Sequence, residues 1–242
     1  QKSPNILLAK HLNTTPEHLC LVNGSAEGIR YIIQAFTSES GKIVGVVPSY
    51  FMFQVYSEMY GRSFVKVPYN DDLSMDIQNI ISTLTPDTQL LILLNPNNPM
   101  GNVYSETEFQ EIIKVCEQLE ITILVDEAYH YFYPGTFVNK VMQEENVVVL
   151  RTFSKAFSIP ALRLGVITAN PKIIHYIENA KLTFDVNSVA LLFGERLLDH
   201  PEILKEIVNE ENEAKKYTLR ELERHGYNCR DCRGNYIFVE PK

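Results

Sequence analysis

The sequence has no run of apolar residues long enough to cross a bilayer, which argues against a membrane-spanning protein. It is also short of basic residues, since 22 Lys and Arg stand against 30 Asp and Glu for a net charge of −8. An acidic chain without a basic run is unsuited to nucleic acid or to an anionic membrane surface. We therefore expect neither as a partner, although this charge is compatible with a local cationic pocket for a small anion.

Signature motifs for nucleotides and metals are missing as well. No GxGxxG segment and no Walker loop occurs, so neither standard nucleotide-binding fold is favoured. Cys229 and Cys232 form a single CxxC pair, but no second pair and no histidine cluster completes a tetrahedral site. We favour free thiols in a reducing cytoplasm over half of a zinc site or a redox pair, and we predict no metal site.

What the sequence does contain is an alternation of short apolar runs with longer helical ones. The short runs are rich in Val, Ile and Leu and mostly lack polar alternation, which is typical of strands buried on both faces. The predicted strands cover residues 42–47, 63–67, 89–94, 121–125, 147–150 and 164–168.

The helical runs carry start signals of their own. Ser105 is followed three residues later by Glu108, which is a capping-box signature, and Asp76 is a candidate cap for a shorter helix. Helices are predicted at residues 25–38, 76–84, 105–119, 171–181, 187–200 and 202–225. Strands that alternate with helices predict an α/β fold with a largely parallel sheet.

The character of the chain changes after about residue 171, where helices follow one another before a last strand at 235–239. We interpret this change as the start of a second, smaller domain. The sequence begins without Met and stops directly after the last strand, so we expect both ends to be cut from a longer chain.

Polar side chains follow four of the predicted strands, at the edge where a parallel sheet binds its ligands. In chain order these segments are PSY (48–50), NPNNPMG (95–101), DEAY (126–129) and RTFSK (151–155). A fifth segment, NGSAEG (23–28), opens the first helix, where Gly24 allows a tight turn and free N–H groups favour an anion. We expect all five to meet at one rim of the sheet.

The chemistry of this set suits a phosphate-bearing, aromatic, nitrogen-containing cofactor that forms an imine. Lys155 supplies an amine, and Asp126 supplies a partner for a pyridinium nitrogen. A phenol and an amide can bind a ring hydroxyl, and an aromatic side chain can stack on the ring. Arg163, with the hydroxyls of Ser25 and Ser154, can hold a phosphate.

These residues resemble the motifs of fold-type I pyridoxal-phosphate (PLP) aminotransferases of class I/II. The likeness lies in Asn98-Pro99-x-Gly101, Asp126-x-x-Tyr129, and Ser154-Lys155 with Arg163 eight positions later. The runs NGSAEGI, NPNNPMG, DEAY, RTFSKAF and ALRLG look like those of histidinol-phosphate aminotransferases, and the likeness covers nearly the whole chain.

The resemblance implies a fold and a reaction. The fold would be a three-layer α/β large PLP-binding domain at residues 1–178, with part of a small α+β C-terminal domain at 179–242. The reaction would move an amino group from an amino acid or amine, of histidinol-phosphate-like or aromatic type, to a 2-oxo acid. The cofactor would be PLP and the assembly a homodimer.

The resemblance also implies a role for each site residue. Lys155 would bind the cofactor covalently and then move the proton at the substrate Cα, while Asp126 would keep the ring nitrogen protonated. Tyr129 and Asn98 would bind the ring oxygen O3′, and Tyr50 would stack on the ring. These roles make Lys155, Asp126 and Tyr129 the catalytic residues. The phosphate would be bound around Gly24, Ser25, Ala26, Thr152, Ser154 and Arg163.

Several alternatives stay open. Threonine-phosphate decarboxylases resemble the same runs, so decarboxylation of an amino acid phosphate is a second hypothesis, and a non-catalytic PLP-binding protein is a third. Ser25 could serve only as the N-cap of its helix, and Tyr50 could be an ordinary core residue. Lys181 and Lys205 are interpreted as solvated.

Overall fold

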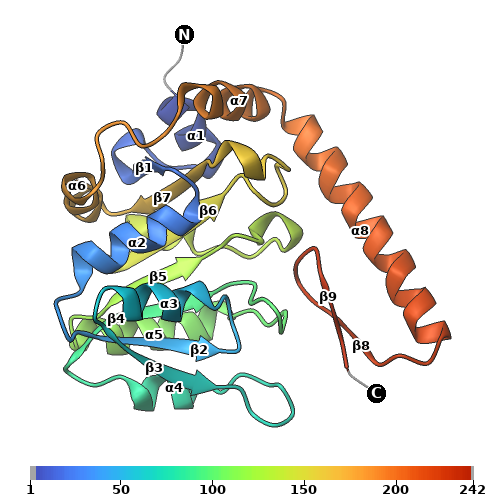
Figure 1. The fold of residues 1–242 in the computed structure, drawn as a ribbon, viewed down its shortest axis with the longest axis horizontal. Coiled ribbons are helices and arrows are strands. Elements are labelled where there is room, and N and C mark those ends of the chain that lie inside the picture. The colour runs from blue at the N-terminus through green and yellow to red at the C-terminus, as the bar shows by residue number, and fades with distance from the viewer. Residues whose placement is uncertain (1–3, 241–242) are drawn as a thin grey trace.

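The computed structural model describes residues 4–240, and its main feature is a seven-stranded sheet in the order β1-β7-β6-β5-β4-β2-β3 (Figure 1). Neighbouring strands pair parallel except around β7, which is antiparallel to both β1 and β6. The predicted α/β fold with a mostly parallel sheet is confirmed. The strands are β1 (Leu19–Val22), β2 (Lys42–Val47), β3 (Ser63–Pro68), β4 (Thr88–Leu94), β5 (Thr122–Asp126), β6 (Val147–Thr152) and β7 (Gly165–Ala169).

Helices cover both faces of this sheet, so the body has three layers. Side chains alternate along each strand: in β4, Leu91 and Leu93 join one buried apolar cluster, while Leu90 and Ile92 join another. The first cluster packs under α1, α4, α5 and α7, and the second under α2, α3 and α6. These helices are α1 (Pro4–Leu12), α2 (Ser25–Phe36), α3 (Met52–Met59), α4 (Ile77–Thr83), α5 (Glu106–Gln118), α6 (Pro171–Ala180) and α7 (Ser188–Asp199).

Local capping explains where several helices begin. The side chain of Ser105 accepts from the Glu108 N–H and the Glu108 carboxylate accepts from the Ser105 N–H, which confirms the predicted capping box of α5. Asp76 accepts from the first backbone N–H groups of α4, also as predicted. The sequence did not predict α1, β1, α3 or the short strand at Cys229–Asp231. The two strands have only four and three residues, and α3 begins without a side-chain cap.

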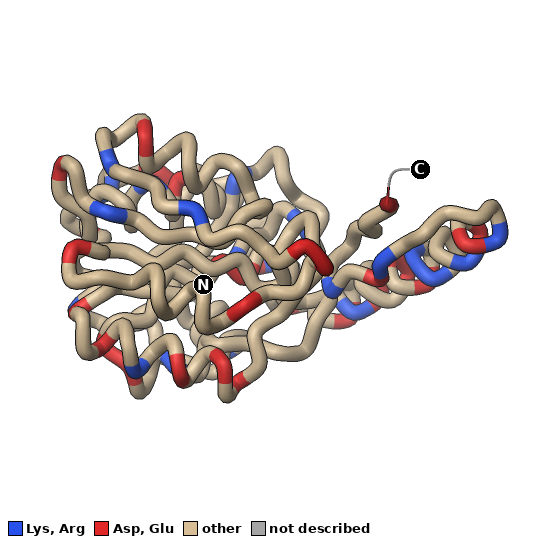
Figure 2. Tube along the Cα trace, turned by 90° about the horizontal axis from the view of Figure 1, so that it is seen from below, with Lys and Arg blue, Asp and Glu red and all other residues tan. Residues whose placement is uncertain are grey.

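The C-terminal part lies beside the body rather than in its sheet (Figure 1). It consists of the long helix α8 (Pro201–Arg224) and an antiparallel pair, β8 (Cys229–Asp231) and β9 (Ile237–Val239). Figure 2 shows basic and acidic residues along most of α8, and Leu204 is its buried residue. The division into a large domain at 1–178 and a small one at 179–242 stays a prediction.

Three further predictions from the sequence, on the cysteines, Lys181 and Lys205, have an outcome here. All four cysteines are unpaired, as expected for free thiols. Lys181 is not solvated: its Nζ donates to the Leu21 carbonyl at 2.8 Å and lies 3.1 Å from the buried Asp185 carboxylate. That prediction was wrong because the end of α6 packs against the edge strand β1, whereas Lys205 is exposed as expected. Among residues 4–240, no helix is both long and apolar enough to span a membrane.

Candidate active site

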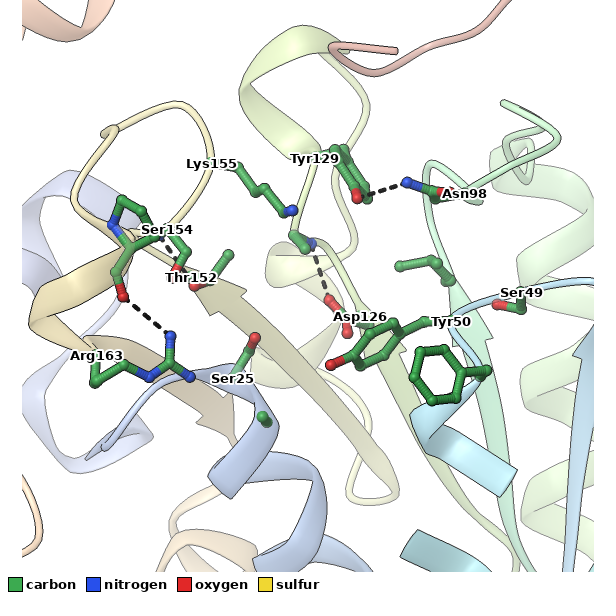
Figure 3. Close-up of a pocket in the computed structure, with 15 residues that line it drawn as sticks. Ser25, Ser49, Tyr50, Asn98, Asp126, Tyr129, Thr152, Ser154, Lys155 and Arg163 are labelled. Carbon is green, nitrogen blue, oxygen red and sulfur yellow. Dashed lines mark hydrogen bonds between the residues drawn. The ribbon is translucent and has the colours of Figure 1, made fainter. Parts of the chain in front are cut away.

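A cavity of about 500 Å³ opens at the carboxyl ends of β4, β5 and β6 (Figure 3). Every predicted site residue except Gly24 lines it, so the five segments meet at one rim as expected. The predicted residues in its wall are Ser25, Ala26, Tyr50, Asn98, Asp126, Tyr129, Thr152, Ser154, Lys155 and Arg163. Gly24 stands directly behind this wall, against Arg163.

Asp126 is the last residue of β5 and lies at the floor of the cavity. Its side chain is almost fully buried, and its Oδ1 accepts a hydrogen bond from the Ala128 N–H at 2.9 Å. Burial raises the pKa of Asp126 to about 7, since a carboxylate is poorly solvated there, and Lys155 only partly opposes this rise. A cationic group placed against Asp126 would therefore be bound strongly.

Lys155 and the Tyr129–Asn98 pair form the opposite side of the cavity. The Asn98 Nδ2 donates to the Tyr129 hydroxyl at 2.7 Å, and the Lys155 Nζ lies 5.4 Å from the centre of the Tyr129 ring (Figure 3). The loop that carries Lys155 is shaped by a hydrogen bond from the Ser154 N–H to the Thr152 hydroxyl. An amine, a phenol and an amide thus face the same space.

The start of α2 and Arg163 form a cationic wall of the cavity. Gly24, with φ of 80°, is the N-cap, and Ser25 is the first helical residue, so the interpretation of Ser25 as the N-cap is wrong. A Cβ on Gly24 would lie 2.4 Å from the Arg163 Nη2, which means that only glycine lets the guanidinium approach the helix start. The Ser25 hydroxyl, the first N–H groups of α2 and Arg163 are together suited to a phosphate.

Aromatic side chains frame the mouth of the cavity. Tyr50 is 38% exposed and meets Phe53 edge-on at 5.5 Å, so it is a wall of the cavity and not an ordinary core residue. Phe51, which sequence analysis left unassigned, also lines the cavity and is 69% exposed. The neighbouring aromatic residues Phe51, Phe53 and Tyr56 favour a core interpretation of Tyr50, and only the tertiary structure shows which rings face solvent.

A buried ion pair at the carboxyl ends of β5 and β6 was not predicted from the sequence. Arg151 donates to the Glu127 Oε2 through Nε at 2.9 Å and Nη2 at 2.8 Å, and the Glu127 carboxylate also accepts from the Phe137 N–H. Glu127 follows Asp126 and Arg151 precedes Thr152, so the pair ties the end of β5 to the end of β6. Opposite charges next to two predicted site residues were the available signal.

His130 lies against this ion pair, and its contribution to stability depends on pH. Burial, followed by the charge of Arg151, lowers the pKa of His130 from 6.5 to about 4. The unfolded chain therefore binds a proton before the folded chain does, and the contribution of His130 to the free energy of unfolding should fall as the pH drops from 6.5 to 4. We expect a loss of about 3 kcal/mol from this residue, measurable as urea unfolding at several pH values.

The matched variants are His130→Gln and His175→Gln, because His175 is exposed on α6. Relative to the wild type, His130→Gln should gain about this amount of stability between pH 6.5 and 4, and His175→Gln should keep the pH dependence of the wild type. Equal pH dependence in both variants would contradict the assignment to His130.

Known proteins of similar sequence support a family assignment. The family described as aminotransferase class I and II matches residues 5–241. The chain belongs to this family. A histidinol-phosphate aminotransferase of Thermoanaerobacter sp. (strain X514) is 33% identical over 237 residues, covering 97% of this chain and 66% of that protein. One of Thermotoga sp. (strain RQ2) is 34% identical over 221 residues, covering 90% of this chain and 62% of that protein.

Solved structures of aminotransferases have the same fold. A histidinol-phosphate aminotransferase of Sinorhizobium meliloti, in complex with pyridoxal-5'-phosphate, matches 98% of this chain and 67% of its own with a TM-score of 0.89 and 22% identity. The enzyme of Clostridium acetobutylicum matches 98% of this chain and 71% of its own, with a TM-score of 0.88 and 24% identity. The fold is thus that of fold-type I aminotransferases, and the chain spans slightly less than two thirds of the curated relatives it matches.

Proposed function

We propose that this chain is the core of a PLP-dependent aminotransferase that moves an amino group from an amino acid or amine to a 2-oxo acid. The observation that carries the proposal is the convergence of three groups on one cavity: the amine of Lys155, the buried carboxyl of Asp126 and the cationic wall at Arg163. Membership of the aminotransferase family supports it, and so does the PLP bound to the relative from Sinorhizobium meliloti.

The residues present fit PLP on structural grounds. Asp126 is a buried carboxyl whose pKa is raised to about 7, so it gains most from a protonated ring nitrogen. The close approach of Arg163 to Gly24 forms a cradle that a Cβ would fill, and a phosphate suits its charge. Tyr129 and Asn98 would then hold the ring oxygen, and Tyr50 would stack on the ring.

PLP, when bound, stabilises the negative charge that develops at the substrate Cα. The residues of this chain would position it and handle the protons. Lys155 would hold the cofactor covalently and, once released, carry a proton at the substrate Cα. Asp126 would keep the ring nitrogen protonated, while Tyr129 and Asn98 would orient the ring through its oxygen.

The finer points of the proposal concern substrate and context. We favour a histidinol-phosphate-like or aromatic amino donor, because the named relatives are histidinol-phosphate aminotransferases. Their names also favour transamination over decarboxylation. We further propose a homodimer, since the exposed apolar side chains of Phe51, at the cavity, and Met59, at the end of α3, suit burial by a second copy. The unpaired cysteines are consistent with a cytoplasmic location.

An optical titration tests the proposed function. Purified protein mixed with PLP should develop a visible absorption band, and amino donors should then convert the bound cofactor to its pyridoxamine form with release of a keto product. A screen of histidinol phosphate and aromatic amino acids would rank donors. Absence of the band at saturating PLP would reject the proposal, and release of carbon dioxide without a keto product would favour decarboxylation.

Arg163 should determine how tightly the phosphate is held. We expect Arg163→Gln to weaken PLP binding by about 10- to 100-fold, because charge-assisted hydrogen bonds contribute about 1.5–3 kcal/mol. The affinity for pyridoxal, which lacks the phosphate, should hardly change. Arg224→Gln on the exposed end of α8 is the matched control. Equal losses for PLP and pyridoxal would argue against a phosphate contact at Arg163.

A further inference from the structure

Tyr236 reaches the candidate active site from the C-terminal part of the chain. It lies in the turn that joins β8 to β9, and its ring centre is 4.9 Å from that of Tyr129 at an interplanar angle of 71°. Its hydroxyl donates a hydrogen bond to the Asn97 carbonyl. The side chain therefore touches both segments that carry the Tyr129–Asn98 pair.

Contacts of its neighbours hold the turn that carries Tyr236 in place. A Cβ on Gly234 would lie 2.2 Å from the Tyr236 ring, so the absence of a side chain there makes room for the ring. From α8, the Lys215 Nζ donates to the Cys232 and Gly234 carbonyls at 2.7 and 3.1 Å. A Cβ on Gly101 would lie 2.5 Å from the Cys232 Cα, which shows how closely the turn sits on the loop after β4.

The hydrogen bond from Tyr236 acts on the residue directly before Asn98. The Asn97 carbonyl also accepts from the Gly101 N–H at 2.7 Å, and the Asn97 N–H donates to the Asn102 carbonyl at 2.9 Å. Asn97 is almost fully buried, so these contacts fix the backbone at this point of the loop. The Asn98 amide, one residue on, is thereby aimed at the Tyr129 hydroxyl.

We propose that Tyr236 is a positioning residue of the candidate active site, which holds the Tyr129–Asn98 pair in place for the ring oxygen of the cofactor. The inference rests on the proposed function. The C-terminal part would then affect the orientation of the cofactor through the ring contact of Tyr236 with Tyr129 and its hydrogen bond to Asn97. Burial raises the pKa of the Tyr236 hydroxyl well above its usual range, so the group remains a donor at all working pH values.

Two substitutions separate these contacts. Tyr236→Phe keeps the ring and removes the hydrogen bond, and we expect it to weaken PLP binding by about 3- to 10-fold, the size of one neutral hydrogen bond. Tyr236→Leu also removes the ring contact with Tyr129, and it should weaken PLP binding further. It should also shift the pH at which the visible absorption band is half-converted, which we call the spectral pH midpoint. Tyr217→Phe and Tyr217→Leu are the matched controls, because Tyr217 is 61% exposed on α8.

The measurements are the PLP dissociation constant, the spectral pH midpoint and urea unfolding of the PLP-free protein. Tyr236 variants that match the Tyr217 controls in affinity and midpoint, while the wild type binds PLP, would overturn the inference and leave the proposed function intact. If the Tyr236 variants are less stable but keep the PLP affinity and the spectral pH midpoint of the wild type, Tyr236 only contributes to packing, and the inference is also overturned. A wild type that binds no PLP would reject the proposed function itself. If Tyr236→Leu does not fold, Tyr236→Phe alone decides.

Discussion

Lys155→Ala should remove the visible absorption band of the bound cofactor and lower transamination by about 1,000-fold or more, since positioned acid–base catalysis contributes about 10²–10⁴-fold and the covalent attachment is lost as well. Lys155 is exposed to the cavity, and its Nζ lies 5.4 Å from the centre of the Tyr129 ring. Among the described residues that line this space, it is the one lysine. The non-covalent contacts that we propose for PLP at Asp126 and Arg163 would remain in the variant. PLP should therefore still bind, but without the band that marks attachment to Lys155.

The control for this result is Lys172→Ala, because Lys172 is exposed on α6 and pairs with Glu145 on the surface. Spectra of the PLP-loaded proteins and single-turnover rates with an amino donor provide the comparison. Lys172→Ala should behave as the wild type does. A Lys155→Ala protein that retains the band would show that another amine holds the cofactor.

Asp126→Asn should have opposite effects on stability and on function. In the PLP-free protein the folded-state pKa of Asp126, about 7, lies above its unfolded value of 3.8. As the pH rises from 4 to 7 the unfolded chain therefore loses this proton first, and the contribution of Asp126 to the free energy of unfolding falls by up to about 4 kcal/mol. Asparagine removes that loss, so at pH 8 the PLP-free variant should be more stable than the wild type, and at pH 4 the difference should vanish.

In the loaded protein the same substitution would remove the charge that we propose to pair with the ring nitrogen. Transamination should then fall by about 100- to 1,000-fold, because a close ion pair in a buried site contributes several kcal/mol. Urea unfolding of the PLP-free protein at pH 4 and 8 and donor turnover of the loaded protein measure the two effects. Asp199→Asn, at the exposed end of α7, is the control. If Asp126→Asn is less stable than the wild type at pH 8, the buried Asp126 carboxylate does not destabilise the PLP-free protein, and the prediction fails.

The strands and the order of the site segments could be predicted from local pattern. Runs of Val, Ile and Leu identify strands buried on both faces, and the carboxyl ends of parallel strands meet at one edge. Asp126, Thr152 and Lys155 follow such strands, so their meeting was predictable before any distance was known. The capping box at Ser105 was equally local, since both partners lie within one helical turn.

Other features depend on contacts between distant segments. Three contacts join residues that no local pattern relates. They are the approach of Arg163 to Gly24, the ion pair of Glu127 with Arg151 and the hydrogen bond from Tyr236 to Asn97. The same limit explains the wrong predictions. Whether Ser25 caps its helix or faces the cavity depends on the turn at Gly24, and the burial of Lys181 depends on the edge strand beside it.

The sequence by itself therefore determined the fold class, the family and which side chains lie at the ligand-binding edge of the sheet. It could do so because strand burial and strand-end chemistry are set by residues that are neighbours in the chain. The tertiary structure alone decided how those side chains are oriented and what supports them. Close packing brings Arg163, Glu127 and Tyr236 against partners far away in sequence, and such packing is a property of the folded chain as a whole.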